Sequence, residues 1–255
     1  GSQALNNVTT GNSNTAVGFR ALYNNSTASN NTAYGFSAMN ATTTGDRNVA
    51  IGTEALRSNT VGDRSIAVGY HALYSQNPAS NADMYNVAVG HSAFAALTTG
   101  TQNTAVGGVA GDAVTTGSDN TFVGKSAGGA VTTGSSNTAI GEDALLAVTT
   151  ANFNTVLGSG AGRLITSGAK NTIIGGYNGN EDGLDIRTLS KYIVLSDGDG
   201  NARAYFRSNG DWQFHGNTSN AYGAIIENKA STGPNGLLVR FLNNSDDNGN
   251  KNFFE

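Results

Sequence analysis

The sequence predicts an all-β protein, built mainly as a parallel β-solenoid of 17-residue coils and followed by a small antiparallel β region. Two observations predict this: a five-residue pattern of the type NTAVG recurs with a fixed period, and the chain changes character after residue 178. A unit this short cannot bury a core alone. A period of about 20 residues therefore marks an array in which each unit packs on its neighbours.

The repeat is regular over most of the chain. Ten copies of the pattern end in glycine, at intervals of 17 residues except for one interval of 21. These glycines are Gly18, Gly35, Gly52, Gly69, Gly90, Gly107, Gly124, Gly141, Gly158 and Gly175. The first residues fit the second half of the same unit, so the chain is expected to begin inside a repeat. We assign residues 1–178 to a repeat domain of ten to eleven coils.

Each copy predicts a short strand that is apolar on both faces. The residue before the glycine is apolar in every copy, from Val17 to Ile174, and we expect it to line the coil interior together with the residue two positions earlier. The opposite face carries no polar residue from Ala16 to Ile173. A strand that is apolar on both faces is usually buried on both, so this second face is expected to meet another chain.

Asparagine and glycine are predicted to have structural roles. An asparagine precedes the strand in nine of the ten copies, Ser65 being the exception, and stacked amides can form a ladder. Glycine after the strand permits a positive φ, and we expect the same of the glycines in the TTG segments, such as Gly45 and Gly117. Representative positions are Asn14, Gly18, Asn48, Gly52, Asn103, Gly107, Asn137 and Gly141.

The end of the chain predicts a different structure. Residues 179–190 are expected to form a linker, and residues 191–255 an antiparallel hairpin region that is cut at the C-terminus. The first hairpin would turn at Asp197-Gly198-Asp199-Gly200-Asn201, with a second turn at Ser208-Asn209-Gly210-Asp211, and a further pair would join AIIENK to GLLVRFL. Asp197, Asp199 and Asn201 alternate as in calcium loops but lack the later acidic ligand, which favours a simple turn.

Composition argues against several classes of function. Charged residues make up 13%, cysteine is absent and the net charge is −4, so neither nucleic-acid binding nor membrane insertion is expected. Clustered carboxylates for acid–base work are lacking in the repeats, and the glycine-rich stretches lack the lysine of a phosphate loop. We expect no enzyme, no catalytic residue, no cofactor and no metal. A paired site at His71 and His91 is a minor alternative to exposed turn residues.

The one irregular coil, from Gly69 to Gly90, has four extra residues. Insertions in solenoids form loops on one face, and such loops often bind. Tyr74, Pro78, Met84 and Tyr85 are therefore candidate receptor contacts. The alternative is a tolerated insertion whose tyrosines pack on the next coil.

The motif NVAIG, from Asn48 to Gly52, and its relatives resemble the SVAIG motif of trimeric autotransporter adhesin heads. That resemblance implies a left-handed parallel β-roll wound as a homotrimer, although the period here is 17 rather than about 14. The segment from Leu195 to Phe214 resembles β-rich segments of bacteriophage tail fibres, which often precede an intramolecular chaperone.

These resemblances imply a structural and adhesive fibre segment, first of all of a phage tail. Its partners would be its own copies, neighbouring fibre or tail proteins, and a host surface glycan or protein receptor. It would lie on the virion, outside the cell. The head of a bacterial surface adhesin is the alternative. An ice-binding solenoid is a minor one, because the paired threonines are expected at a corner rather than in outward ranks.

Overall fold

The computed structural model describes residues 1–214, which contain strands and turns but no helix. Accordingly, no helix within this range is long and apolar enough to cross a membrane. The chain divides into two units, Gly1–His215 and Gly216–Glu255, and the described residues all belong to the first. The expected hairpin of AIIENK and GLLVRFL lies outside the described residues.

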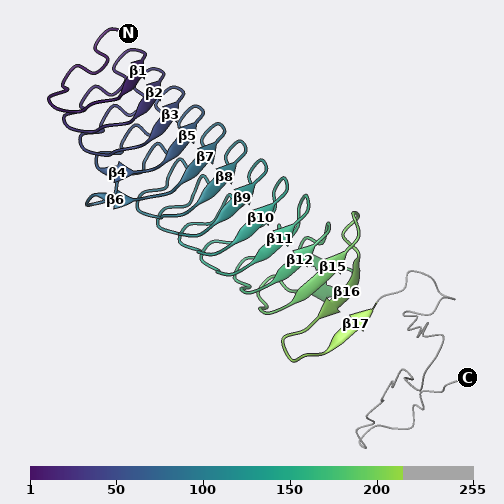
Figure 1. Ribbon diagram of the computed structural model, residues 1–255. Coiled ribbons are helices and arrows are strands. Elements are labelled where there is room, and N and C mark those ends of the chain that lie inside the picture. The colour runs from purple at the N-terminus through teal and green to yellow at the C-terminus, as the bar shows by residue number, and fades with distance from the viewer. Residues whose placement is uncertain (215–255) are drawn as a thin grey trace, which may run out of the picture. The chain divides into compact units, whose positions relative to one another are not determined.

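The repeat forms a parallel β-solenoid of about eleven coils of about 17 residues, as predicted (Figure 1). Its strands belong to one 13-stranded sheet, and equivalent residues pair in register, for example Thr104 with Thr121. The ten strands of this sheet that belong to the repeat are β1 (Thr15–Val17), β2 (Thr32–Tyr34), β3 (Val49–Ile51), β5 (Ile66–Val68), β7 (Val87–Val89), β8 (Thr104–Val106), β9 (Thr121–Val123), β10 (Thr138–Ile140), β11 (Thr155–Leu157) and β12 (Thr172–Ile174).

The sheet continues beyond the repeat. β15 (Ile193–Ser196) pairs in parallel with β12, and β16 (Ala202–Phe206) and β17 (Trp212–Phe214) follow in antiparallel order, as expected for the two turns at 197–201 and 208–211. The segment 179–190, expected as a linker, holds the antiparallel pair β13 (Asn180–Glu181) and β14 (Leu184–Asp185). Its Ile186 is fully buried, and the Thr166 amide donates to the Arg187 carbonyl at 2.9 Å. This stretch thus packs on the preceding coil.

The assignment of strand faces from the sequence was wrong. The middle residue of each strand points into the coil, so that Ala105 is fully buried, whereas Val106 beside it is 39% exposed. The interior is narrow, because the strand faces a second segment that carries an alanine in each coil, followed in most coils by a leucine or another large apolar residue, as in Ala144 and Leu145. Only a small residue fits between them in most coils.

Where a larger side chain enters the interior, a glycine makes room for it. Phe122 replaces the strand alanine, and glycine stands at positions 111 and 128 where other coils have leucine. A Cβ on Gly128 would lie 2.7 Å from the Phe122 ring, and one on Gly111 would lie 2.4 Å from Phe94. The core therefore keeps its volume from coil to coil by pairing large with small residues.

The two kinds of glycine corner differ. Strand-end glycines have positive φ as predicted, for example +140° at Gly107. The TTG glycines do not, which corrects the sequence expectation; they are needed because a Cβ on Gly117 would lie 2.2 Å from the Gly134 carbonyl oxygen of the next coil. The left-handed residue at this corner is the one before the asparagine, or before Ser65 in the one coil without it: Ser13, Asn30, Arg47, Arg64, Tyr85, Gln102, Asp119, Ser136, Phe153 and Lys170.

The asparagines form the predicted ladder inside the coils. The Asn120 side chain donates to the Gly134 carbonyl at 2.9 Å, and its oxygen accepts the Asn137 backbone amide at 3.0 Å. At the one break, Ser65, the buried Gln76 takes over by bonding both Ser65 and the Asn86 side chain. The side chains of the ladder asparagines are thereby satisfied within the stack.

Candidate functional site

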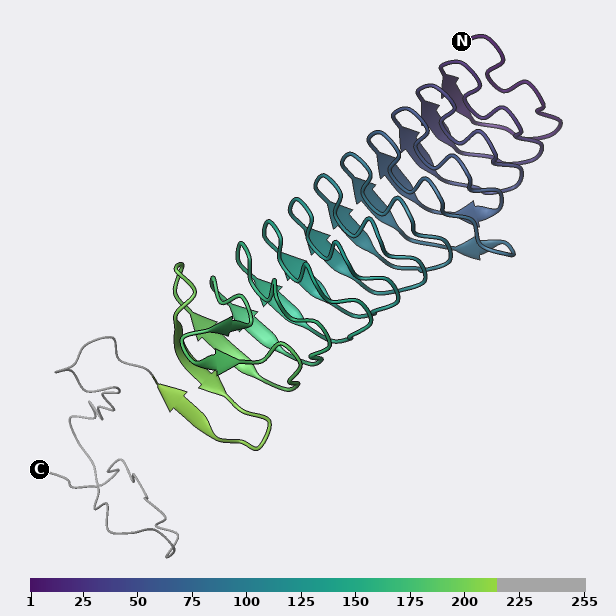
Figure 2. The ribbon, with the colours of Figure 1, turned by 180° about the vertical axis from the view of Figure 1, so that it is seen from behind.

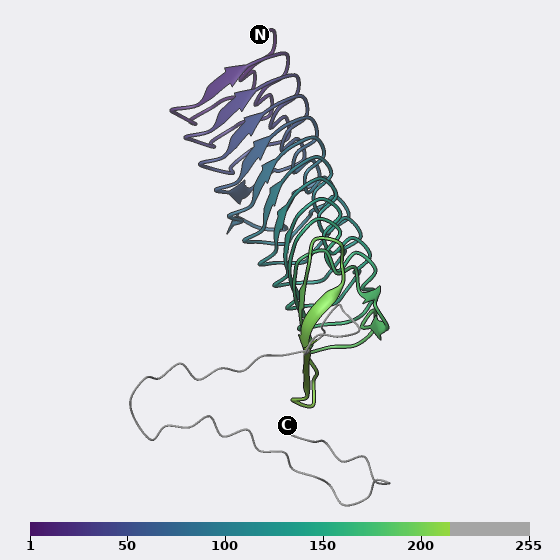
Figure 3. The same cartoon turned by 90° about the vertical axis from the view of Figure 1, so that its right-hand side faces the viewer.

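The outer face of the sheet carries an apolar residue at the end of every strand of the repeat. It is formed by the residues before and after the buried middle residue of each strand, and Figure 3 shows these strands along one side of the stack. Exposed apolar residues on this face are Val17, Tyr34, Ile51, Ile66, Val106, Ile140, Leu157 and Ile174 in the repeat, and Ile193, Leu195, Phe206, Trp212 and Phe214 beyond it. We call this the outer sheet face. A soluble monomer rarely exposes so extensive an apolar surface without a partner.

Threonine forms a rank on the same face. In β8 to β12 every strand has the order threonine, buried residue, aliphatic residue, as in Thr138, Ala139 and Ile140. The threonines pair with each other from coil to coil. The sequence pattern predicts this column inside the coil, and its outward position instead provides regular hydroxyl and methyl groups on a flat surface.

The irregular coil projects from the stack on the side where β4 (Gly62–Asp63) and β6 (Ala82–Asp83) pair in parallel (Figure 2). Two of its four candidate receptor contacts are not at the surface: Met84 is fully buried and Pro78 is buried. A Cβ on Gly62 would lie 3.0 Å from the Met84 side chain and 3.2 Å from Pro78. Both side chains therefore support the enlarged coil from inside.

The two candidate tyrosines belong to different surface groups. Tyr85 is 50% exposed; Arg64 donates to its hydroxyl at 3.2 Å and pairs with Asp83. Tyr74 is half-buried, and its hydroxyl accepts a hydrogen bond from Arg57 of the preceding coil. Tyr74 and Tyr85 therefore hydrogen-bond to different residues and do not form one site.

Tyr74 belongs to a surface cluster at the corner after the strand. Tyr70 stacks on His71 with ring centroids 3.8 Å apart and on His91 at 5.2 Å. The His71 ring lies 4.6 Å from that of Tyr74, and His71 Nε2 lies 2.7 Å from Glu54 Oε2. We call the group the corner cluster; its members are Glu54, Arg57, Tyr70, His71, Tyr74 and His91.

The sequence pointed to the two histidines of this cluster but not to Glu54, Arg57 or Tyr70. His71 and His91 do not face each other as a metal pair, since each stacks on Tyr70. Within residues 1–214 no group of three or more histidine, aspartate or glutamate side chains is arranged to hold a metal ion. The signal that could have revealed the cluster is positional, because Tyr70 and His91 both directly follow a strand-end glycine.

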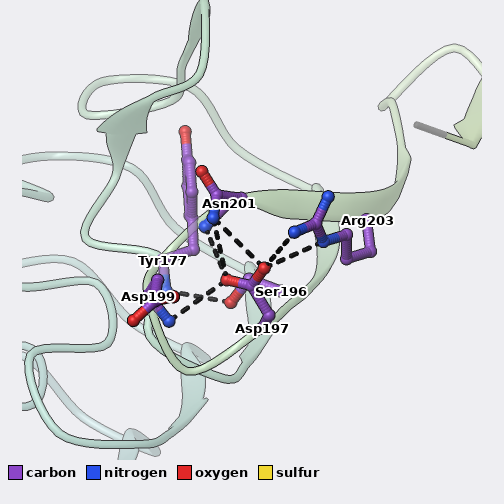
Figure 4. Close-up of polar contacts among 6 residues, drawn as sticks. All are labelled: Tyr177, Ser196, Asp197, Asp199, Asn201 and Arg203. Atoms are coloured by element: carbon purple, nitrogen blue, oxygen red, sulfur yellow. Dashed lines mark hydrogen bonds and ion pairs between the residues drawn. The ribbon is translucent and has the colours of Figure 1, made fainter. Parts of the chain in front are cut away.

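The turn between β15 and β16 is a hairpin closed by Asp197 (Figure 4). One carboxylate oxygen accepts the backbone amides of Asp199 at 3.1 Å and Asn201 at 3.0 Å, and the other accepts Arg203 Nε at 2.9 Å. Hydrogen bonds from Asn201 and then from Arg203 lower the pKa of Asp197. Since an arginine already neutralises this carboxylate, the turn does not suit a calcium ion.

The same turn is tied to the preceding coil. The Ser196 hydroxyl accepts the Tyr177 backbone amide at 2.9 Å, and the Tyr177 hydroxyl donates to the Leu184 carbonyl at 2.6 Å. Burial raises the pKa of Tyr177 well above its ordinary value, so this hydroxyl stays a donor. These contacts fix the antiparallel hairpin on the last coil. They are structural in character.

Comparison of the chain with protein-family models, with curated proteins and with solved structures gives no match, so its function is inferred from its own geometry.

Proposed function

We propose that this chain is a structural and adhesive fibre segment that assembles as a parallel homotrimer, first of all in a bacteriophage tail fibre. The observation that carries the proposal is the outer sheet face. Nine of the eleven parallel strands and the two antiparallel strands beyond them present exposed aliphatic or aromatic side chains on one side. The natural occupant of a repetitive flat face is an identical face with the same spacing.

The corrected orientation of the strands supports assembly better than the orientation expected from the sequence. An outer column of alanines would offer little apolar area. Full burial of an exposed valine, isoleucine or leucine side chain, in contrast, contributes about 1.5–3 kcal/mol. Val106, Ile140 and Ile174 are between 37% and 45% exposed in the single chain. Association would remove these side chains from water.

Two neighbouring residues provide the test. Val106→Asp places a charge on the outer sheet face, so we expect a folded β-rich monomer where the parent is a trimer. Ala105→Asp places the charge inside the coil, where an unpaired buried charge costs several kcal/mol, so we expect loss of folded structure itself. Light scattering gives the mass and circular dichroism the fold.

The parent should scatter as three chains of 26.0 kDa. A parent that is monomeric at micromolar concentration, or a Val106→Asp variant that assembles as well as the parent, would contradict the trimer. Attachment is tested separately by adsorption of the parent to immobilised bacterial surface polysaccharides. The head of a bacterial adhesin is the alternative source, and sequence flanking this chain distinguishes it, since an adhesin continues into a membrane anchor.

The threonine rank favours one second function, ice binding. Five successive strands repeat threonine, buried residue and aliphatic residue on the outer sheet face, at strand spacings of about 4.8 Å. Ice binding needs this face open to water, whereas a trimer covers it. Thermal hysteresis in the parent that disappears in Thr138→Tyr would favour ice binding, and its absence would reject it.

A further inference from the structure

Exposed aromatic side chains are unevenly distributed along the repeat. Phe19, Tyr34, Phe36, Tyr70 and Tyr85 are exposed in the first half. From residue 92 to residue 177, which the structure describes throughout, Phe153 is the sole exposed aromatic residue. The backbone is the same in both halves, so the fold alone does not account for this difference.

Equivalent positions show that the corner cluster is not required by the coil. The position of Tyr70 is occupied by Thr53 in the coil before it and by Gly108, Lys125 and Glu142 farther along. The position of His71 is occupied by Ser92 in the next coil, and that of Tyr74 by Ala95. The left-handed backbone is retained, with φ of 55° at His71 and 53° at Ser92.

The cluster is held in one geometry by its own contacts. Glu54 lies 2.7 Å from His71 Nε2 and 3.4 Å from Arg57 Nε, and the Arg57 guanidinium lies 5.5 Å from the Tyr74 ring centroid. Tyr70 nevertheless remains 47% exposed, and His91 is also exposed. The rings and polar groups are thus pre-positioned while still reachable from solvent, which reduces the entropy lost on binding.

We propose that the corner cluster binds a neutral saccharide, a proposal that rests on the attachment role proposed above. Aromatic rings pack on the weakly positive C–H groups of a pyranose, and the carboxylate of Glu54 and the guanidinium of Arg57 can accept from and donate to its neighbouring hydroxyls. One negative and one positive side chain give no excess charge for an acidic sugar. The net charge of the chain, −4, also disfavours polyanions.

The test replaces the cluster with residues that the same positions carry in other coils. The triple variant Tyr70→Thr, His71→Ser, Tyr74→Ala takes its residues from Thr53, Ser92 and Ala95, so the coil should fold as before. The control is Phe153→Gln, which removes the most exposed aromatic side chain of the second half. Glutamine is chosen because Gln102 occupies the equivalent position in another coil. Both are measured as assembled protein on an array of immobilised neutral and acidic oligosaccharides.

We expect the parent to bind neutral oligosaccharides, the triple variant to bind them at least about tenfold more weakly, and the control to match the parent within about twofold. Equal binding by the triple variant and the parent would overturn the site. Binding to acidic glycans alone, or to none, would overturn the ligand class.

Failure of this proposal is distinguishable from failure of the fibre function. Light scattering on the same samples reports the trimer, and adsorption to bacterial polysaccharides reports attachment at any site. If the triple variant loses assembly rather than binding, the cluster is a subunit contact and the saccharide proposal is wrong. If the parent trimer adsorbs to polysaccharides but the triple variant adsorbs equally, attachment stands and the site lies elsewhere.

Discussion

At each strand end, glycine meets two demands at once. Gly107 has φ of +140°, which side chains rarely adopt, and a Cβ there would lie 2.5 Å from the carbonyl oxygen of Gly124 in the next coil. Gly108 beside it has neither restriction, since an added Cβ meets nothing within 4 Å. The two positions therefore separate the contribution of close coil stacking from that of glycine flexibility.

We predict that Gly107→Ala destabilises the protein by about 3 kcal/mol or more, because backbone strain adds to a clash with backbone that cannot move aside. Gly108→Ala should be neutral or stabilising by about 0.4–1 kcal/mol, through a less flexible unfolded chain. Denaturant unfolding of the two variants measures both values. Equal effects would mean that coil spacing does not depend on the strand-end glycine.

The asparagine ladder gives a second prediction at the same scale. Asn120→Ala leaves the Gly134 carbonyl and the Asn137 amide without their partners in a buried corner. Each unsatisfied buried group costs about 1–3 kcal/mol, so a loss of about 2–4 kcal/mol is expected. Asn24→Ala, on the exposed surface, is the control and should change the free energy of unfolding by less than about 0.5 kcal/mol.

Among the elements, the β15–β16 hairpin depends on an ionised aspartate. Hydrogen bonds from Asn201 and Arg203 lower the pKa of Asp197, so their stabilisation is present above the ordinary aspartate pKa of about 3.9 and is lost as pH falls through the lower folded value. We expect the Asn201 amide, which donates to Asp197, to lose protection from hydrogen exchange in that acid range. In Asp197→Asn this pH dependence should disappear; a persistent one would implicate another group.

The irregular coil can be shortened to 17 residues without changing the sequence of the adjacent coils. Replacing residues 77–85 by the segment TTGTQ, residues 98–102 of the next coil, restores the 17-residue period. Because Gln76 remains in the asparagine ladder, we expect a folded protein with the oligomeric state of the parent, measured by circular dichroism and light scattering. Loss of saccharide binding in this variant, with Tyr70, His71 and Tyr74 unchanged, would place the receptor contact in the loop near Tyr85.

Period and register could be predicted from the sequence, because glycine and asparagine recur at positions that every coil requires. The inward face could not be predicted from alternation, since Ala105 and Val106 are both apolar and alternation identifies two faces without saying which is inside. Residue size carried the information: seven of the ten inward residues are alanine, and the phenylalanine among them, Phe122, is matched by glycines at positions 111 and 128. Pro78 and Met84 were expected at the surface because they belong to the insertion, but their side chains fill the interior of the enlarged coil.

The candidate site was predicted only in part. His71, His91 and Tyr74 stood out as individual residue types, but their grouping depends on which positions meet across coils of different length. Glu54 and Arg57 come from the coil before, 17 residues from His71 and Tyr74 respectively. A search restricted to nearby sequence cannot find such pairs, whereas alignment of the repeats by their glycines does.

At the scale of the whole solenoid, each coil bonds only to the coils before and after it. About eleven coils rising ~4.8 Å each give a rod segment of roughly 50 Å. Small-angle scattering of the assembled protein should require such an elongated component in its pair-distance distribution. A distribution typical of a compact globule would contradict the stacked arrangement in solution.

The pairing of Phe94 and Phe122 with glycines in nearby coils has a consequence for how such a chain can change in length over generations. Recombination between repeated gene segments removes or adds whole 17-residue units and leaves every strand, corner and ladder position in phase. Units with leucine at the core position can be exchanged freely, whereas the unit containing Gly111 can be inherited only together with the phenylalanines that fill its space. Variation in rod length among descendants should therefore concentrate in the leucine-bearing coils and spare residues 91–128.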